Sequence, residues 1–257
     1  MNQTAMKADT TLDMGETYDR DAELFAEADK LTTWMYVVKS ALKKVLAPVL
    51  KPGMKILNLG SASARVEAGV LMPGGVLPQD ITGVEISPKQ VEIARKRIPR
   101  ATFLVGDISD PALLAGQDGA FDAVTSSMVF EHVSAEQFAQ VCANTHRLLK
   151  SGGLFAFVAT HPDKMKDLDG NYITHYGMFE TSFPWGGTGH NWRHKISSIT
   201  EMMTKAGFKV TLVEELAYPK EPPAGLTPDE LAKFTADGER YWKDKYIRYA
   251  VQAKRLP

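Results

Sequence analysis

Short apolar segments alternate with helix-compatible segments between residues 55 and 159, and this alternation constrains the fold more than any other feature of the chain. The apolar segments are residues 55–59, 81–86, 101–105, 121–126 and 154–159. Apolar strands that alternate with helices form βαβ units, in which helices cover both faces of a parallel sheet. The sequence therefore predicts an α/β fold.

The chain continues this pattern on both sides. Residues 19–46 carry apolar side chains at helical spacing and are followed by Pro48 and a turn at 51–53. Residues 196–206 are expected to form a helix and 209–214 a strand, while 246–253 alternates like a terminal antiparallel strand. We therefore expect a Rossmann-like open, mostly parallel sheet of about seven strands, with an antiparallel end and helices on both faces.

Three segments lie outside the regular alternation and are expected to form a small cap. Residues 1–50 are predicted to be an N-terminal helical cap, and residues 51–257 the main domain. Two insertions in that domain, at about 162–195 and 217–246, are predicted to be lids over a substrate. The first is interpreted as loop-like, and the second as a Pro-rich turn followed by a helix.

Composition excludes several classes of protein. The 30 Lys and Arg residues nearly cancel the 31 Asp and Glu residues, so no basic excess is available to neutralise a nucleic-acid backbone. The single cysteine, Cys142, excludes an intramolecular disulfide framework and fits a reducing compartment. No apolar run reaches the roughly 20 residues of a membrane span, and residues 1–16 lack the apolar core of a signal peptide. We expect a cytoplasmic protein; its oligomeric state is not indicated.

Three loops at the carboxyl ends of successive predicted strands carry the chemical information. Right-handed crossovers place such loops at one sheet edge, where ligands bind. The first loop, 58–65, is built of small residues that allow a ligand to approach the backbone. Glu85, 25 residues after Gly60, can accept hydrogen bonds from both hydroxyls of a ribose. Asp107 can accept a hydrogen bond from an adenine amino group, while Ile108 packs on the base.

At these loops the chain resembles the class I S-adenosylmethionine-dependent methyltransferases, over about residues 52–160 and more loosely over 196–255. The resemblance implies S-adenosylmethionine as cofactor and S-adenosylhomocysteine as product. It implies that the loop around Gly60 lines the methionyl part, and that Ser126 or Ser127, with Met128, borders the methyl-transfer site. The residues expected to bind the cofactor are Asn58, Gly60, Ser61, Ala62, Glu85, Ile86, Asp107, Ile108, Ser126, Ser127 and Tyr18.

The first loop departs from the family pattern. The family commonly has Asp where this chain has Asn58, and it has more glycines than Gly60 alone. Asn58 can accept a hydrogen bond from the ammonium group of the cofactor, but without charge assistance. Ala62 and Ala64 resist a positive φ, so a somewhat different loop shape is expected. The loop has Gly60, Ala62 and Arg65 at the three glycine positions of the G-x-G-x-x-G pattern, which argues against a nicotinamide dehydrogenase.

The insertion at 162–195 is rich in aromatic residues, histidines and glycines, and we interpret it as a substrate lid. An ordinary connection that covers the sheet edge is the alternative. The residues expected to bind the substrate are Trp185, Phe179, Tyr176, Met128 and Trp34. If the acceptor must lose a proton, the candidate bases are His175, His190 and His161. For the Glu131-His132 pair a structural role is favoured over catalysis, and the histidine spacing does not indicate a metal site.

These observations predict methyl transfer to a nitrogen or oxygen of a small, planar aromatic or heteroaromatic metabolite, of the kind found in secondary metabolism. A non-catalytic S-adenosylmethionine-binding protein is one alternative, motivated by Asn58 and the glycine-poor loop. A methyltransferase that acts on a protein or RNA partner is the other, although the aromatic insertion and the neutral net charge stand against it.

Overall fold

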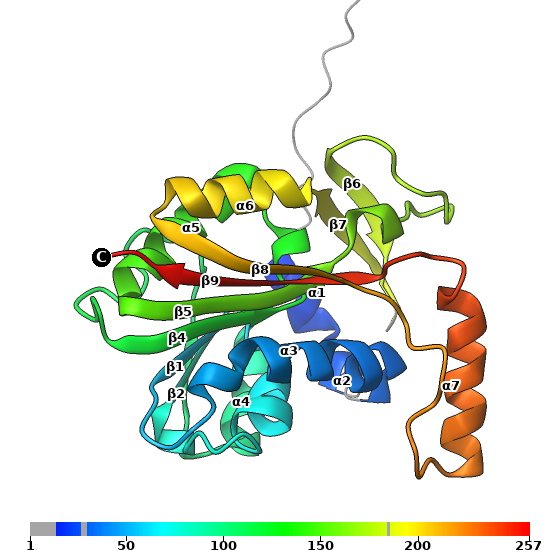
Figure 1. Cartoon of the computed structure of the whole chain (residues 1–257), viewed down its shortest axis with the longest axis horizontal. Helices are drawn as coiled ribbons and strands as arrows, with labels where there is room; N and C mark the ends of the chain where they lie inside the picture. Colours follow the sequence, from blue (N-terminus) through cyan, green and yellow to red (C-terminus); the bar gives the residue numbers. More distant parts are fainter. Residues whose placement is uncertain (1–13, 27–29, 184–185) are drawn as a thin grey trace, which may run out of the picture.

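The computed structural model describes residues 14–26, 30–183 and 186–257, and its centre is a seven-stranded sheet (Figure 1). The strand order is β3-β2-β1-β4-β5-β9-β8. The strands are β1 (Ile56–Leu59), β2 (Ile81–Glu85), β3 (Thr102–Val105), β4 (Phe121–Ser127), β5 (Leu149–Thr160), β8 (Phe208–Leu216) and β9 (Arg248–Arg255). β1 to β5 pair in parallel, whereas β9 is antiparallel to both β5 and β8. This confirms the predicted Rossmann-like α/β sheet with an antiparallel end.

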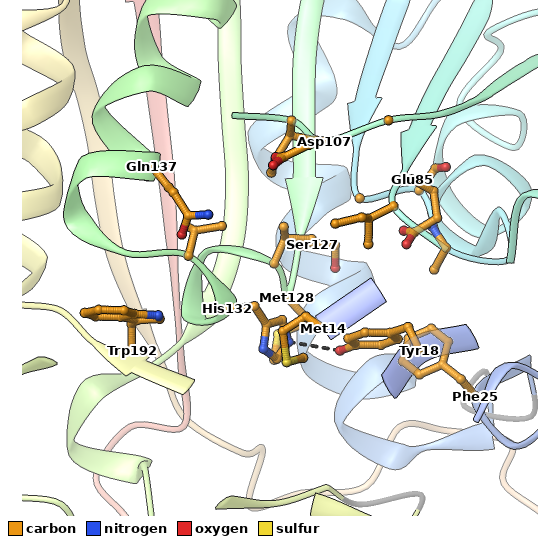
Figure 2. Close-up of a pocket in the computed structure, with 18 of the residues that line it drawn as sticks. Met14, Tyr18, Phe25, Glu85, Asp107, Ser127, Met128, His132, Gln137 and Trp192 are labelled. Atoms are coloured by element: carbon orange, nitrogen blue, oxygen red, sulfur yellow. Dashed lines mark hydrogen bonds between the residues drawn. The ribbon is translucent and has the colours of Figure 1, made fainter. Parts of the chain in front are cut away.

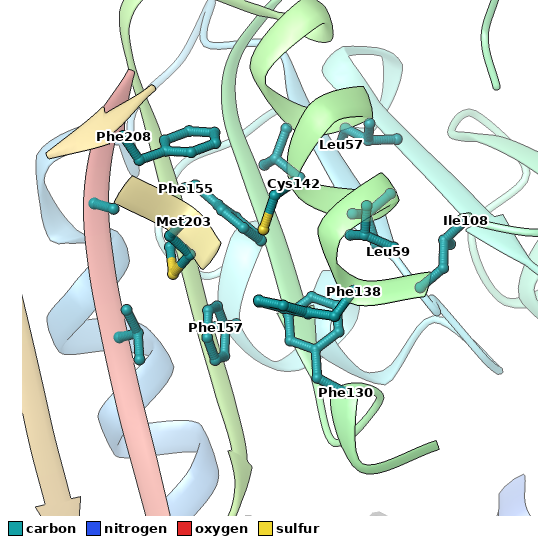
Figure 3. Close-up of a cluster of buried hydrophobic side chains, with 14 of the residues drawn as sticks. Leu57, Leu59, Ile108, Phe130, Phe138, Cys142, Phe155, Phe157, Met203 and Phe208 are labelled. Atoms are coloured by element: carbon teal, nitrogen blue, oxygen red, sulfur yellow. The ribbon is translucent and has the colours of Figure 1, made fainter. Parts of the chain in front are cut away.

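Helices cover both faces of this sheet because its central strands are apolar on both sides. Phe155 and Phe157 point to one face, where they pack with Phe130 and Phe138 below α5 (Ala135–Leu148) and α6 (Ile196–Lys205) (Figure 3). Ala156 and Val158 point to the other face, against α3 (Lys39–Leu46). The alternation along β5 thus places one apolar cluster on each side of the sheet.

Local sequence signals start the helices that flank the sheet. α5 begins with a capping box, in which the Ser134 hydroxyl accepts a hydrogen bond from the backbone N–H of Gln137, and Oε1 of Gln137 accepts one from the backbone N–H of Ser134. α7 (Pro228–Tyr241) begins with the same motif, formed by Thr227 and Glu230. α4 (Pro88–Arg97) is capped by Ser87, with proline at its first position.

The described part of the N-terminal segment forms short helices that lie across the edge of the sheet. These are α1 (Met14–Arg20), α2 (Ala22–Ala26) and the π-helix η2 (Trp34–Val38), which runs into α3. α1 contacts α4 on one side and β7 (Thr188–Arg193) on the other. The segment therefore bridges the parallel part of the sheet and the 162–195 region.

The prediction of a loop at 162–195 is wrong, because this region contains a β-hairpin. β6 (Gly177–Ser182) pairs antiparallel with β7, in a two-stranded sheet separate from the main one. Gly186 and Gly187 near its turn have φ angles of +102° and +76°, which favour glycine. The described residues contain no helix with the length and apolarity needed to cross a bilayer.

Candidate functional site

A cavity of about 460 Å³ lies at the carboxyl ends of β1 to β4, and loops, α1 and the hairpin contribute to its walls (Figure 2). Its size is in the range of small-molecule sites. One end is lined by the three loops predicted from the sequence, namely by Gly60, Ser61, Ala62, Glu85, Ile86, Gly106, Asp107 and Ile108, with Val129 beside Gly60. The other walls, which we call the acceptor end, are lined by Met14, Tyr18, Met128, His132, Val133, Met178, His190 and Trp192, and Figure 2 shows Trp192 and Glu85 on opposite sides of the cavity.

The loop after β1 approaches the cavity with its backbone. Gly60 has a φ of +69°, and a Cβ added there would lie 2.3 Å from Cγ2 of Val129, so no larger residue fits without rearrangement. Ala62 and Ala64 also adopt the left-handed region, with φ of 45° and 63°. Both alanines therefore adopt the positive φ that we expected them to resist, although this conformation costs roughly 1 kcal/mol or more per residue.

Glu85 holds this loop in place. Its Oε2 accepts the backbone N–H of Ala62 at 2.9 Å, and its Oε1 accepts that of Ser87 at 3.0 Å. The carboxyl group is buried beside the cavity, and burial raises its pKa above the ordinary value while the two backbone hydrogen bonds oppose this shift. Glu85 thus stabilises the loop and presents a carboxylate to a ligand.

Asp107 and Ile108 complete the third loop. Oδ1 of Asp107 accepts the backbone N–H and the hydroxyl of Ser109, both at 2.7 Å. These two bonds fix the orientation of the carboxylate and engage only one of its oxygens. Ile108 is buried in the core below α5 and also lines the cavity. The pair therefore offers an acceptor beside an apolar surface.

Asn58 and Ser126 lie behind the cavity and do not line it, contrary to their expected contact with the cofactor. The side-chain amide of Asn58 donates to Oε1 of Glu67 at 2.8 Å, and both residues are fully buried. The hydroxyl of Ser126 donates to the carbonyl of Leu59 at 2.8 Å. Each side chain is engaged by a neighbour in the core, so neither is placed to bind a ligand in the cavity.

Glu67 makes this buried pair sensitive to pH. Burial raises the pKa of Glu67 from 4.5 to about 7, although the Asn58 hydrogen bond opposes the shift. The folded protein therefore binds more protons than the unfolded chain between these two pKa values, and the contribution of Glu67 to the free energy of unfolding falls as pH rises through that window. Between a pH below both pKa values and a pH above both, the contribution of Glu67 to the free energy of unfolding changes by about 3 kcal/mol.

We expect Glu67→Gln to raise the free energy of unfolding by up to about 3 kcal/mol at pH about 8, and by little at pH about 5. A neutral amide avoids the cost of a buried charge and still accepts the Asn58 hydrogen bond. Urea unfolding of both proteins at the two pH values measures the difference, with Glu239→Gln on the exposed face of α7 as control. An equal effect at both pH values would contradict the assignment.

The alternation of side chains along the hairpin decides which of its residues face the cavity. Met178 is the cross-strand partner of Trp192, and Glu180 is that of His190, so these four side chains share one face. Met178, His190 and Trp192 line the cavity from this face. Phe179 points to the opposite face and is buried with Met165 and Ile173, away from the cavity. The expected substrate contact of Phe179 is therefore not supported.

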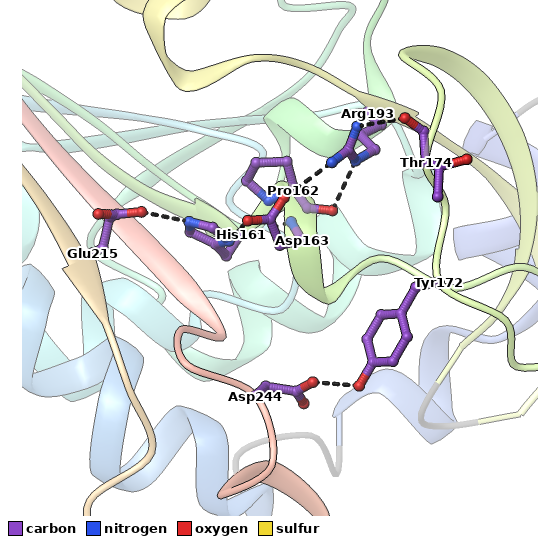
Figure 4. A network of polar contacts seen from close by, with 8 residues as sticks. All are labelled: His161, Pro162, Asp163, Tyr172, Thr174, Arg193, Glu215 and Asp244. Atoms are coloured by element: carbon purple, nitrogen blue, oxygen red, sulfur yellow. Dashed lines mark hydrogen bonds and ion pairs between the residues drawn. The ribbon is translucent and has the colours of Figure 1, made fainter.

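Two of the three candidate bases lie elsewhere. Nε2 of His161 is 2.8 Å from Oε1 of Glu215 on β8, in a polar network that also includes Asp163 and Arg193 (Figure 4). His175 is exposed and is absent from the cavity lining among the described residues. Only His190 reaches the cavity, and burial lowers its pKa below the ordinary value.

The remaining predicted substrate residues divide in the same way. Met128 lines the cavity with a φ of 60°. Trp34 is buried in the core, and the guanidinium of Arg65, a cavity residue, lies 4.5 Å from its ring centre. Tyr176 is exposed and packs against Arg193 on the outer side of the hairpin. Trp185 lies outside the described residues.

His132 lines the cavity, although sequence analysis favours a structural role for it. Its Nε2 is 2.9 Å from the hydroxyl of Tyr18 on α1, and the two rings meet edge to face (Figure 2). Burial lowers the pKa of His132 and raises that of Tyr18. Cavity residues not predicted include Met14, Phe25, Arg65 and Gln137, with Met178 and Trp192 on the hairpin. These residues reach the cavity through tertiary packing, which the sequence does not reveal. For Trp192 alone the sequence offered a signal, namely the aromatic composition of the insertion.

Comparison with known proteins supports an enzyme domain at this site. The sequence model of a family described as "Methyltransferase domain" matches residues 57–157. An uncharacterized methyltransferase of Synechocystis is 28% identical over 136 residues, which cover 53% of this chain and 61% of the relative. The demethylmenaquinone methyltransferase of Thermotoga maritima is 28% identical over 207 residues, which cover 76% of this chain and 87% of the relative.

A solved structure shows the same fold. The crystal structure of an S-adenosylmethionine-dependent methyltransferase from Mesorhizobium loti superposes with a TM-score of 0.64. The match covers 88% of this chain and 99% of the other at 21% sequence identity. The fold of this chain is therefore that of a known architecture.

Proposed function

Residues 57–157 of this chain form a class I S-adenosylmethionine-dependent methyltransferase domain, and from this premise we propose that the protein methylates a nitrogen or oxygen of a small, planar aromatic or heteroaromatic metabolite. The observation that carries the proposal is the composition of the cavity. Polar groups that suit an adenosyl ligand gather at one end, and apolar and aromatic side chains gather at the other. A ligand at the first end would therefore direct its reactive group toward a second molecule at the other end.

The residues at the first end fit S-adenosylmethionine. Glu85 suits the ribose hydroxyls, and the free oxygen of Asp107 suits the adenine amino group, with Ile108 against the base. Ser61 and Ser127 also line the cavity, although their hydroxyl oxygens are buried without a hydrogen-bond partner among the described residues. The positive charge of Arg65 suits the methionyl carboxylate.

The other end suits a flat and largely apolar acceptor. Met14, Met128 and Met178 are flexible and polarizable, and Trp192 presents a flat wall. The Thermotoga relative is named for demethylmenaquinone, a quinone, which is consistent with a planar acceptor. When bound, the cofactor supplies an electrophilic methyl group on sulfur. The protein then contributes mainly positioning and the exclusion of water.

The test is to incubate the protein with a metabolite pool and S-adenosylmethionine that carries a labelled methyl group. We expect one or a few labelled small molecules, whose structures reveal the acceptor and the methylated atom. Label in protein or RNA instead would favour the macromolecular alternative. Tight cofactor binding without labelled product from a broad pool would favour the non-catalytic alternative, which Asn58 and the alanines of the first loop motivate.

We expect Asp107→Ala to lose discrimination for the adenine base. The wild-type protein should prefer S-adenosylhomocysteine to its inosyl analogue, because a carboxylate accepts a hydrogen bond from an amino group and repels a carbonyl oxygen. The preference should fall about tenfold. This is the lower end of the effect of losing a charge-assisted hydrogen bond, because Asp107 is exposed and water competes for its oxygens. Calorimetry with both ligands measures it, with Asp118→Ala as control. An unchanged preference would contradict the adenine assignment.

A further inference from the structure

Tyr18 and His132 meet at the acceptor end of the cavity although 114 residues separate them in sequence (Figure 2). Tyr18 lies on α1, and His132 ends η6 (Phe130–His132), the turn that follows β4. The Tyr18 hydroxyl and Nε2 of His132 are 2.9 Å apart, and both residues line the cavity. A phenol and an imidazole in hydrogen-bond contact beside a reaction space form a path for a proton.

The role of the imidazole decides which nitrogen must carry its proton. The Tyr18 hydroxyl meets Nε2, whereas Nδ1 of His132 and Oδ1 of Asn191 on β7 are both buried without a hydrogen-bond partner among the described residues. The backbone of His190 and the side chain of Asn191 each raise the pKa of His132, against the larger effect of burial. A neutral ring that accepts the Tyr18 hydroxyl at Nε2 carries its proton on Nδ1.

A neighbouring charge stabilises the imidazole once it is protonated. Glu131 is buried, and its Oε1 accepts a hydrogen bond from Thr160 at 2.7 Å. Its charge raises the pKa of His132, against the dominant effect of burial and the smaller effect of His190. Glu131 and Glu85 raise the pKa of Tyr18, whereas Arg65 lowers it. Burial thus keeps the imidazole neutral at rest, Glu131 reduces the cost of protonating it during the reaction, and the tyrosine stays neutral.

We propose that Tyr18 and His132 act together as the base of the methyl transfer, and that the acceptor is therefore a phenol or a heteroaromatic N–H that loses its proton. This inference rests on the proposed function. The acceptor oxygen or nitrogen forms the new bond to the methyl carbon while the methyl–sulfur bond breaks and its electron pair stays on sulfur. The acceptor proton moves to the Tyr18 oxygen as the Tyr18 proton moves to Nε2 of His132. The imidazolium then releases a proton to water.

His190, the candidate base that reaches the cavity, is less suited to this role. Burial is the only cause of a shift in the pKa of His190, and it lowers that pKa. The structure shows no hydrogen bond from its ring to another described residue, and Glu180, its cross-strand partner, does not raise its pKa. Tyr18 and His132 instead have a defined contact with each other and a carboxylate behind them, so a proton that reaches His132 is stabilised.

Nuclear magnetic resonance of protein labelled with ¹⁵N-histidine tests the tautomer without an acceptor. At pH about 7.5 we expect His132 to carry its proton on Nδ1, with Nε2 unprotonated, and Tyr18→Phe to reduce this preference. His132→Gln assigns the signals, and exposed His175 serves as an internal reference. A proton on Nε2 in the wild type, or no response to Tyr18→Phe, would overturn the proposal.

Kinetic measurements with the acceptor that the labelling experiment identifies test the reaction step. We expect Tyr18→Phe to lower kcat about 100-fold with little change in KM or cofactor affinity, and the wild-type rate to fall as pH drops through the His132 pKa. His146→Gln and Tyr246→Phe, away from the cavity, are matched controls that should retain activity. A product methylated on an atom that had no proton to lose, or a variant with unchanged kcat, would overturn the proposal. If the wild-type protein binds the cofactor but methylates no compound, the proposed function is refuted. The NMR measurement of the His132 tautomer then still tests the contact between Tyr18 and His132.

Discussion

Replacing Glu85 by alanine is expected to weaken the binding of S-adenosylhomocysteine on the order of 10²- to 10⁴-fold. Two hydrogen bonds from ribose hydroxyls to a carboxylate contribute about 1.5–3 kcal/mol each, and about 1.4 kcal/mol corresponds to a factor of ten in affinity. The effect should be large because the carboxylate is buried, so water competes poorly for its oxygens. Titration calorimetry measures the affinity, and Glu92→Ala, exposed on α4, is the control.

Glu85 also accepts the backbone N–H of Ala62, so the variant loses a contact that shapes the first loop. A ligand pair separates the two effects. If the carboxylate binds the ribose, the wild type should prefer S-adenosylhomocysteine to an analogue without ribose hydroxyls, and Glu85→Ala should lose most of that preference. If Glu85 only stabilises the loop, both ligands should weaken equally. A folded variant with unchanged affinity would refute the ribose assignment.

The sheet and its ligand-binding edge could be predicted because their signals are local. The first three parallel strands are short apolar runs with a small or acidic residue at the last position or within two residues after it, namely Gly60, Glu85 and Asp107. The rule that connections are right-handed then brings these ends together without further information. The structure places these three residues around one cavity, together with Ser61, Ile86, Ile108 and Ser127.

The hairpin could not be predicted because its strands do not alternate cleanly in hydrophobicity. Polar and aromatic side chains occur on both of its faces, with Met178 and Trp192 on one and Phe179 on the other. Without a strand assignment, neither face is defined, so the predicted substrate residues of the segment include Phe179 and Tyr176, which the structure places away from the cavity, and omit Trp192, which lines it. Once the register is known, the alternation of side chains along each strand shows which residues face the cavity.

Other site features depend on contacts between distant segments. Asn58 looked like a cofactor ligand because of its place in the loop, yet the amide is held by Glu67, which arrives from the following helix. His161 is a candidate base in the sequence because it begins the segment rich in histidines and aromatic residues, yet Glu215 on β8 engages it. Sequence spacing gives no information about these partners, because burial of a polar group requires a partner from wherever the fold supplies one.

The other large effect is expected at Trp192. Trp192→Ala should lower kcat for the acceptor about 100-fold and leave the affinity for S-adenosylhomocysteine within about twofold. The indole is a flat wall at the acceptor end, and a misplacement of about 1 Å can cost on the order of 100-fold in rate. Trp192 also lines a second groove on the outer side of the hairpin, so its loss should open the reaction space to water.

Variants at two positions separate positioning from folding. Trp192→Phe retains a flat wall and should recover much of the rate, whereas Trp242→Ala, at the C-terminal end of α7, removes an equally large side chain that does not line the cavity. Melting temperatures and single-turnover rates should be measured on the same preparations. If Trp192 serves only to pack the hairpin, its variant should melt earlier and keep full activity per folded molecule. The acceptor would then bind against Tyr18 and Met128, and the β6–β7 segment would be a cover without contact to the substrate.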